Sequence, residues 1–85
     1  MSRRWNLYVV RCSDGTLYTG VTLDTGRRLM EHNESSRGAK YTRARRPVVL
    51  VYSEEHDDRS SAQKAERRFK ALTRKQKEAI VNESR

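Results

Sequence analysis

The sequence contains few of the residues that build disulfide frameworks, zinc modules or membrane spans. Its 85 residues include one cysteine, one proline and four glycines. Cys12 alone can neither form an internal disulfide nor supply a zinc site. No apolar run reaches the length of a membrane span, and the N-terminal MSRRWN lacks the apolar core of a signal peptide. The sequence therefore predicts a non-membrane protein of the reducing cytoplasm.

Hydrophobic residues are also scarce, at 34% of the chain against 35% charged residues. Such a balance occurs in disordered chains. Here, however, the apolar residues are periodic and glycine and proline are rare, which favours a folded domain with a charged surface. The length predicts a single domain over residues 1–85 with one small core.

Acidic residues are too few to balance the basic ones. The net charge is +8, of which residues 1–47 carry +6 and residues 48–85 carry +2. A basic field of this kind attracts polyanions, so nucleic acid is the first candidate partner. An anionic membrane surface is a weaker candidate, because no predicted helix places basic residues opposite a bulky aromatic face.

Two strands are predicted over residues 5–13 and 16–22, joined at the turn signal Asp14-Gly15. A two-residue loop would mix the apolar and tyrosine faces of the hairpin. A three-residue loop over residues 13–15, with Gly15 at positive φ, separates them, and we choose this register. One face then carries Leu7, Val9, Leu17 and Val21, and the other carries Tyr8, Val10, Tyr18 and Gly20.

The rest of the chain predicts helices around a third strand. Asp24 is a suitable N-cap for a helix to about residue 33, followed by a loop. The apolar run 48–52 predicts a strand covered on both faces, and the acids around His56 predict a solvated loop rather than a metal site. Two further helices are predicted. One covers residues 60–72 and starts with a capping box at Ser60/Gln63, and the other runs from residue 73 to about residue 82 and starts with a capping box at Thr73/Gln76.

A candidate site lies in the stretch YTGVTLDTGRRLMEH, residues 18–32. Tyr18, Thr19 and Gly20 end the strand half of this stretch. Arg28 and His32 are four residues apart on the following helix, so they point to the same side. A phenol, a guanidinium and an imidazole delivered to one place can grip or cut a phosphodiester. The alternative is a tyrosine packed on the sheet beside two solvated helix residues.

Two other features add to this site. The segment RGAKYTRARR, residues 37–46, has five basic residues and no acid. It predicts phosphate contacts that do not read sequence, with a base stacked on Tyr41, and the alternative is a solvated loop. The basic residues are Arg37, Lys40, Arg43, Arg45 and Arg46. Glu66 flanks the apolar stripe of its helix, which predicts a partly buried carboxylate, and its simpler role is an ion pair with Lys70.

The order Tyr8, Tyr18-Thr19-Gly20, Arg28, His32, Glu66 resembles the GIY-YIG nuclease superfamily. The whole chain resembles the small stand-alone bacterial members of that superfamily. The resemblance implies an α/β (α+β) fold, with a three-stranded antiparallel sheet flanked by helices. It also implies an endonuclease that hydrolyses DNA phosphodiester bonds with one divalent metal, Mg²⁺ or Mn²⁺, in repair or recombination.

The resemblance also implies a role for each site residue. Tyr8 and Tyr18 would be the active-site tyrosines, one of which orients or deprotonates the attacking water. Arg28 would stabilise the phosphoryl transition state, His32 would assist near the scissile phosphate, and Glu66 would hold the metal. A free tyrosine has a pKa near 10, so a nearby cation would have to lower it.

The sequence departs from the family pattern at two positions. Asn6 replaces the glycine of the first motif, and only Asn82 stands near the place of a downstream asparagine. Two functions without catalysis stay open: a nucleic-acid-binding module that keeps the fold and the basic surface, and a structural subunit of a larger repair complex.

Overall fold

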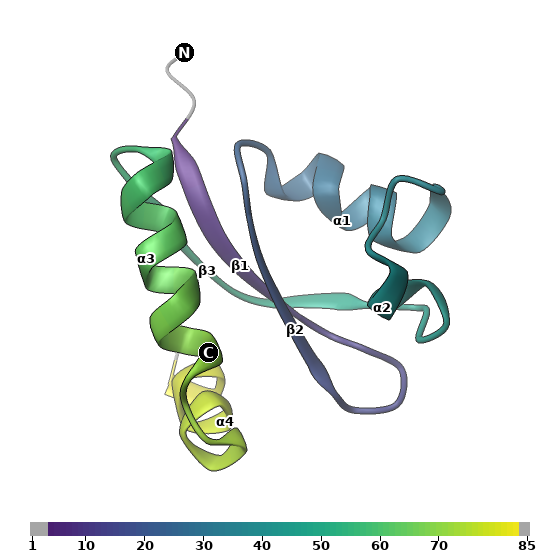
Figure 1. Cartoon of the computed structure of the whole chain (residues 1–85). Helices are drawn as coiled ribbons and strands as arrows, with labels where there is room; N and C mark the ends of the chain where they lie inside the picture. Colours follow the sequence, from purple (N-terminus) through teal and green to yellow (C-terminus); the bar gives the residue numbers. More distant parts are fainter. Residues whose placement is uncertain (1–3, 84–85) are drawn as a thin grey trace.

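The computed structural model describes residues 4–83. Its three strands form one antiparallel sheet in the order β2-β1-β3. Figure 1 shows α1 and α2 on one side of the strands and α3 and α4 on the other. The fold class predicted from the sequence is therefore confirmed. No helix among residues 4–83 is long and apolar enough to cross a membrane. The elements are β1 (Trp5–Arg11), β2 (Leu17–Thr22), α1 (Thr25–Glu34), α2 (Lys40–Arg43), β3 (Val49–His56), α3 (Arg59–Lys70) and α4 (Arg74–Glu83).

The β1–β2 hairpin has the predicted register. Tyr8 faces Gly20, and Leu7 faces Val21. The loop is closed by the Cys12 N–H, which donates to the Thr16 carbonyl, and Gly15 has a φ of 86°. That backbone conformation is easy only for glycine, which confirms the three-residue loop.

Strand β1 is the centre of the sheet and is buried on both faces. On one face Leu7 and Val9 pack with apolar residues of α3 and α4 (Ala65, Phe69 and Val81). On the other face Tyr8 and Val10 pack with Cys12 and Val48. Because side chains alternate along a strand, the predicted separation of tyrosine and leucine faces divides the interior into two small cores.

The prediction for the third strand was wrong in two respects. It runs beyond the apolar segment through Glu54 and Glu55 to His56, because pairing with β1 continues there. It is also an edge strand whose coverage is incomplete: Leu50 packs against one core and Val51 and Tyr52 against the other, but Val49 is 60% exposed. The predicted surface histidine, His56, is partly buried and hydrogen-bonds Glu54 at 2.7 Å.

The cap of α3 also differs from the prediction. Asp58 is the N-cap, and its carboxylate accepts a hydrogen bond from the Ser61 N–H at 2.8 Å. The helix therefore starts before Ser60, and the Ser60/Gln63 capping box was wrong. The charged carboxylate of Asp58 accepts a backbone hydrogen bond more strongly than the hydroxyl of Ser60 does. Asp58 also precedes Ser60 in the chain, so the helix begins earlier.

The other two caps are confirmed. Asp24 caps α1 by accepting from the Arg27 N–H. Thr73 and Gln76 exchange hydrogen bonds at 3.2 and 3.0 Å, as a capping box requires. A correction applies to the basic segment, which was predicted as a loop but contains the one-turn helix α2, Lys40–Arg43.

Candidate active site

The phenol of Tyr8 lies directly over Gly20 on the neighbouring strand. A Cβ atom at position 20 would be only 2.6 Å from the Tyr8 hydroxyl oxygen. Side-chain atoms cannot approach so closely, so the glycine of the Tyr-Thr-Gly motif leaves the space that the phenol occupies. The hairpin register and this glycine together fix where the Tyr8 hydroxyl lies.

Arg28 and His32 both reach the Tyr8 hydroxyl from α1. The His32 Nε2 atom is 2.8 Å from the hydroxyl oxygen, and the Arg28 Nε–H donates to it at 3.3 Å. Arg28 also donates from Nη1 to the Glu31 carboxylate at 3.2 Å and to the Arg37 carbonyl at 2.9 Å. The structure therefore brings together three of the five predicted catalytic residues through direct hydrogen bonds.

Behind His32 lies Thr42, a residue that the sequence analysis did not select. The His32 Nδ1 atom is 2.8 Å from the Thr42 hydroxyl, which donates to the Ala39 carbonyl at 2.9 Å. The hydroxyl has one proton, so it accepts from Nδ1–H, which leaves Nε2 to accept from Tyr8. The Ala39 N–H also approaches Nδ1, but at 3.4 Å it is the weaker contact.

Burial keeps this hydrogen-bonded chain uncharged. It lowers the pKa of His32 to about 4, and the Arg28 charge acts in the same direction. Burial also raises the pKa of Tyr8 and outweighs the lowering by Arg28. At neutral pH a protonated phenol therefore donates its hydrogen bond to a neutral imidazole nitrogen.

The buried histidine predicts an acid-sensitive fold. His32 is fully buried and stays neutral down to a pH of about 4, whereas an unfolded histidine titrates near 6.5. As pH falls from about 6.5 to 4, His32 becomes protonated in the unfolded state but stays neutral in the native state. The free energy of unfolding should then fall by about 3 kcal/mol.

Thermal melts of wild-type, His32→Gln and His56→Gln proteins from pH 7 to 5 test this. We expect only His32→Gln to lose the slope, because carboxylates stay ionised in that range. Equal slopes in all three proteins would contradict the assignment of the slope to His32.

Tyr18 belongs to an aromatic cluster beside His32. Its ring meets the His32 ring edge-on, with centroids 5.3 Å apart, and stacks on Tyr41 at 5.9 Å. The Arg45 guanidinium lies 3.9 Å from the Tyr41 ring centroid. The ring predicted to stack on a base, Tyr41, therefore already contacts two neighbours within the protein.

Glu66 projects from α3 and acts electrostatically on Tyr8. Its negative charge contributes to the raised pKa of Tyr8, which places the carboxylate within electrostatic reach of the phenol. The side chain is 21% exposed, as expected for a residue that flanks the buried stripe, and the Lys70 Nζ lies 3.3 Å from it. Glu66 thus acts electrostatically on Tyr8 and also forms the ion pair of the simpler alternative.

The donor set around Glu66 suits one class of metal. Among residues 4–83 no three His, Cys, Asp or Glu side chains are grouped to hold an ion. This does not fit zinc, which takes three or four protein ligands, but it fits Mg²⁺ or Mn²⁺ held by one carboxylate, waters and substrate phosphates. Asn82 lies exposed near the end of α4.

The basic segment divides into residues that hold the fold and residues that face solvent. Arg46 donates to the carbonyls of His32 and Ser35 at the end of α1, and Arg45 pairs with Asp14 at 3.0 Å. Arg43 donates to the Ser36 carbonyl at 2.9 Å but is exposed, as are Arg37 and Lys40. Charge density in the sequence could not separate these groups.

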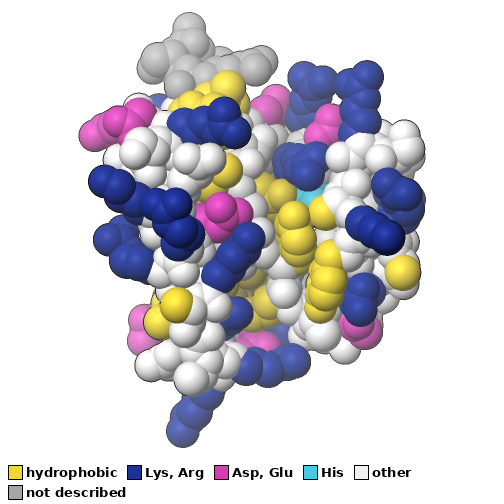
Figure 2. Space-filling model, viewed as in Figure 1, with side chains coloured by type: hydrophobic (Ala, Val, Ile, Leu, Met, Phe, Trp, Pro, Cys, Tyr) yellow, Lys and Arg dark blue, Asp and Glu magenta, His cyan; other side chains and the backbone are white. Residues whose placement is uncertain are grey.

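A second basic surface lies across the site and was missed. In Figure 2, Lys and Arg side chains lie on both sides of a central band of hydrophobic side chains, beside which a histidine and a carboxylate are visible. Lys70 lies beside Glu66 on α3, and a cavity of about 230 Å³ between α2 and α4 is lined by Tyr41, Arg74 and Lys77. Nearby acids hid this surface, because the net charge of residues 48–85 is only +2.

Several known proteins are similar in sequence to this chain over most of its length. The UPF0213 proteins of Desulfotalea psychrophila and Halobacterium salinarum are 52% and 53% identical to it, over 94% and 88% of this chain and 73% and 96% of their own. A solution NMR structure has been solved for the protein EF2693 from E. faecalis, whose sequence is 48% identical to this chain. It matches with a TM-score of 0.62 over 96% of this chain and 85% of its own.

A second solution structure, of the UPF0213 protein BH0048 from Bacillus halodurans, is 39% identical. Its TM-score is 0.60, over 93% of this chain and 83% of its own. The model of the GIY-YIG catalytic domain matches residues 4–79, which include every residue of the site described above. The chain therefore belongs to the GIY-YIG family, and its relatives in that family are UPF0213 proteins.

Proposed function

We propose that the protein is a metal-dependent endonuclease that hydrolyses DNA phosphodiester bonds. The observation that carries this proposal is the buried chain Tyr8–His32–Thr42, with Arg28 on the phenol and Glu66 within electrostatic reach. Buried polar groups are costly unless they are paired, so such a chain under a basic surface supports chemistry on an anionic substrate.

The geometry supports a division of labour around the attacking water. Tyr8 orients that water through its hydroxyl oxygen, while its own proton stays in the hydrogen bond to the neutral Nε2 of His32. This arrangement needs no phenolate and no imidazolium, in keeping with the raised pKa of Tyr8 and the lowered pKa of His32. His32 is fully buried, so it acts through Tyr8 instead of touching the scissile phosphate.

Arg28 and Glu66 would deal with the charge of the phosphate. The planar guanidinium of Arg28 donates to the phosphoryl oxygens as negative charge develops on them. Glu66 would hold Mg²⁺ or Mn²⁺, which supplies Lewis-acid polarisation when bound. Tyr18, whose ring lies against His32, would bind beside the scissile phosphate.

A cleavage assay tests the proposal. The protein is incubated with flaps, forks, nicked duplexes and single strands in the presence of Mg²⁺, Mn²⁺ or chelator. We expect cuts that need the metal, and cuts confined to branched substrates would indicate repair or recombination. Folded protein that binds these substrates but cuts none of them would support the non-catalytic binding module instead.

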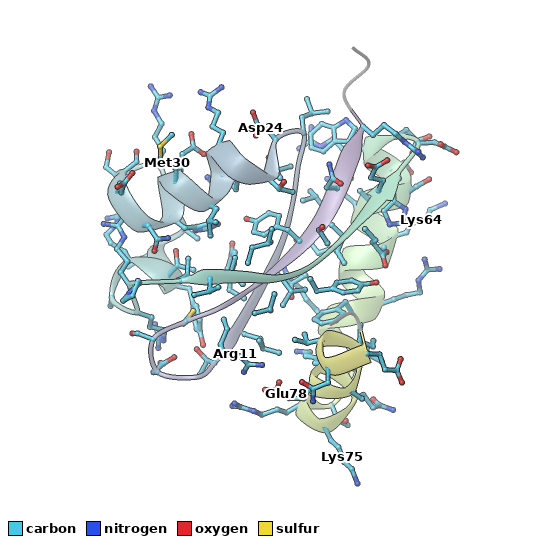
Figure 3. All side chains as sticks on the ribbon, turned by 180° about the vertical axis from the view of Figure 1, so that it is seen from behind. Arg11, Asp24, Met30, Lys64, Lys75 and Glu78 are labelled. Atoms are coloured by element: carbon cyan, nitrogen blue, oxygen red, sulfur yellow. The ribbon has the colours of Figure 1, made fainter. Side chains whose placement is uncertain are left out.

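The exposed part of the basic segment should bind the DNA backbone. The double variant Arg37→Gln/Lys40→Gln removes two cations, and each lost phosphate contact should reduce the slope of log K against log salt by about one. The matched control is Lys64→Gln/Lys75→Gln, whose side chains point outward from α3 and α4 (Figure 3). If both double variants change affinity and slope equally, residues 37 and 40 are only solvated.

A further inference from the structure

A second hollow adjoins the site and has no role in the proposed chemistry. Its volume is about 350 Å³, within the range of roughly 300–1,000 Å³ typical of small-molecule sites. Asp24, where β2 leads into α1, lies at the end of the molecule where β1 and α3 begin (Figure 3). The lining residues include Trp5, Asp24, Arg27, Arg28, Glu31 and Arg59.

Arg28 connects this hollow to the candidate active site. The residue lines the hollow, and its Nε–H donates to the Tyr8 hydroxyl. A DNA strand whose scissile phosphate lies at Arg28 therefore has the hollow beside it. The neighbouring nucleotide of that strand is the group nearest to the hollow.

The chemistry of the hollow suits a flat ring attached to an anion. The indole of Trp5 lines it, and the Arg59 guanidinium lies 5.3 Å from the indole centroid. Among residues 4–83 no carboxylate forms an ion pair with Arg59. The two acids of the hollow are already engaged, since Asp24 caps α1 and Glu31 pairs with Arg27 and Arg28.

We propose that this hollow is a nucleotide subsite, in which the base next to the scissile phosphate stacks on Trp5 and its outer phosphate contacts Arg59. The proposal rests on the proposed nuclease function and specifies how the strand is held. A base inside a duplex has both faces covered by its neighbours, so only an unstacked nucleotide can enter. The subsite thus selects strands with an unpaired nucleotide beside the cut.

Trp5 is the only tryptophan, so its fluorescence reports directly on the hollow. The Glu66→Ala protein is titrated in chelator, where no cleavage occurs, with a short single-stranded oligodeoxynucleotide. The comparison is an abasic strand of the same length and charge. We expect quenching by the strand with bases and none by the abasic strand, although both bind. Equal responses to the two strands, or no response to either, would overturn the proposal.

Variants separate stacking from charge. Trp5→Leu should weaken binding of a labelled oligonucleotide about tenfold, whereas Trp5→Phe, which keeps an aromatic face, should lose much less. Arg59→Gln should weaken binding more than Lys64→Gln, which removes the same charge from the outer side of α3. The proposal would be overturned if Trp5→Leu and Trp5→Phe lost equal affinity and Arg59→Gln and Lys64→Gln also lost equal affinity. Thermal melts show which variants are folded.

The outcome is independent of catalysis. Binding is measured in chelator with Glu66→Ala protein, so a protein that never cuts DNA can still pass this test. Conversely, an active nuclease that shows no base-dependent quenching would refute the subsite and leave the proposed function intact.

Discussion

Glu66→Ala protein is expected to bind DNA but not to cut it. The carboxylate is the only protein ligand proposed for the metal, so its loss removes the Lewis acid from the site. A metal ion contributes several kcal/mol to such reactions, which corresponds to a loss of at least about a hundredfold in cleavage rate. Affinity for DNA should stay the same or increase, because a negative charge near the phosphates is gone.

Lys70→Ala is the matched control. It breaks the same 3.3 Å ion pair and leaves the carboxylate in place. An i,i+4 pair is worth about 0.2–0.5 kcal/mol, so both variants should melt close to the wild-type temperature. Equal, small losses of cleavage in the two variants would show that Glu66 serves only that pair.

Arg28→Lys is expected to lose nearly as much activity while it keeps the positive charge. A lysine ammonium cannot reproduce the planar set of donors with which Arg28 binds the Tyr8 hydroxyl, Glu31 and the Arg37 carbonyl. Removing a donor aimed at developing charge costs roughly 10²–10³-fold in rate in other enzymes, and we expect a loss of that size. DNA affinity should change by far less.

Arg27→Lys is the comparison for this variant. Arg27 is the preceding residue, also pairs with Glu31, and is 60% exposed against 27% for the Arg28 side chain. If the two substitutions reduce the single-turnover cleavage rate equally, charge alone matters on this helix and the specific role of Arg28 is refuted.

The sequence predicted the hairpin and the site motif well, because each depends on local rules. Only one register placed Leu17 and Val21 on the face of Leu7 and Val9, and a slip of one residue would have put Tyr18 on that face instead. The same register brought Tyr8 over Gly20, and helical spacing then brought Arg28 and His32 to the same side of α1.

The features that the sequence did not predict depend on tertiary position. An apolar run such as that of β3 can belong to a central strand or to an edge strand. The position of β3 at the edge follows from its pairing with β1 alone. Thr42 lies on a single helical turn, which leaves no period to detect. Arg46 has the composition of a phosphate-binding residue, yet the carbonyls at the end of α1 determine its contacts.

Helix α1 fully buries a single side chain, and that side chain is His32. Apart from the partly buried Leu29, the helix is held by the hydrogen bonds that His32 makes with Tyr8 of the sheet and with Thr42 of α2, and water can compete for both bonds. Amide hydrogens of α1 should consequently exchange through local openings at lower free energy than those of α3, which is anchored by Ala62, Ala65 and Phe69. His32 and Tyr8, which are proposed to take part in the reaction, therefore also hold α1 in its folded position.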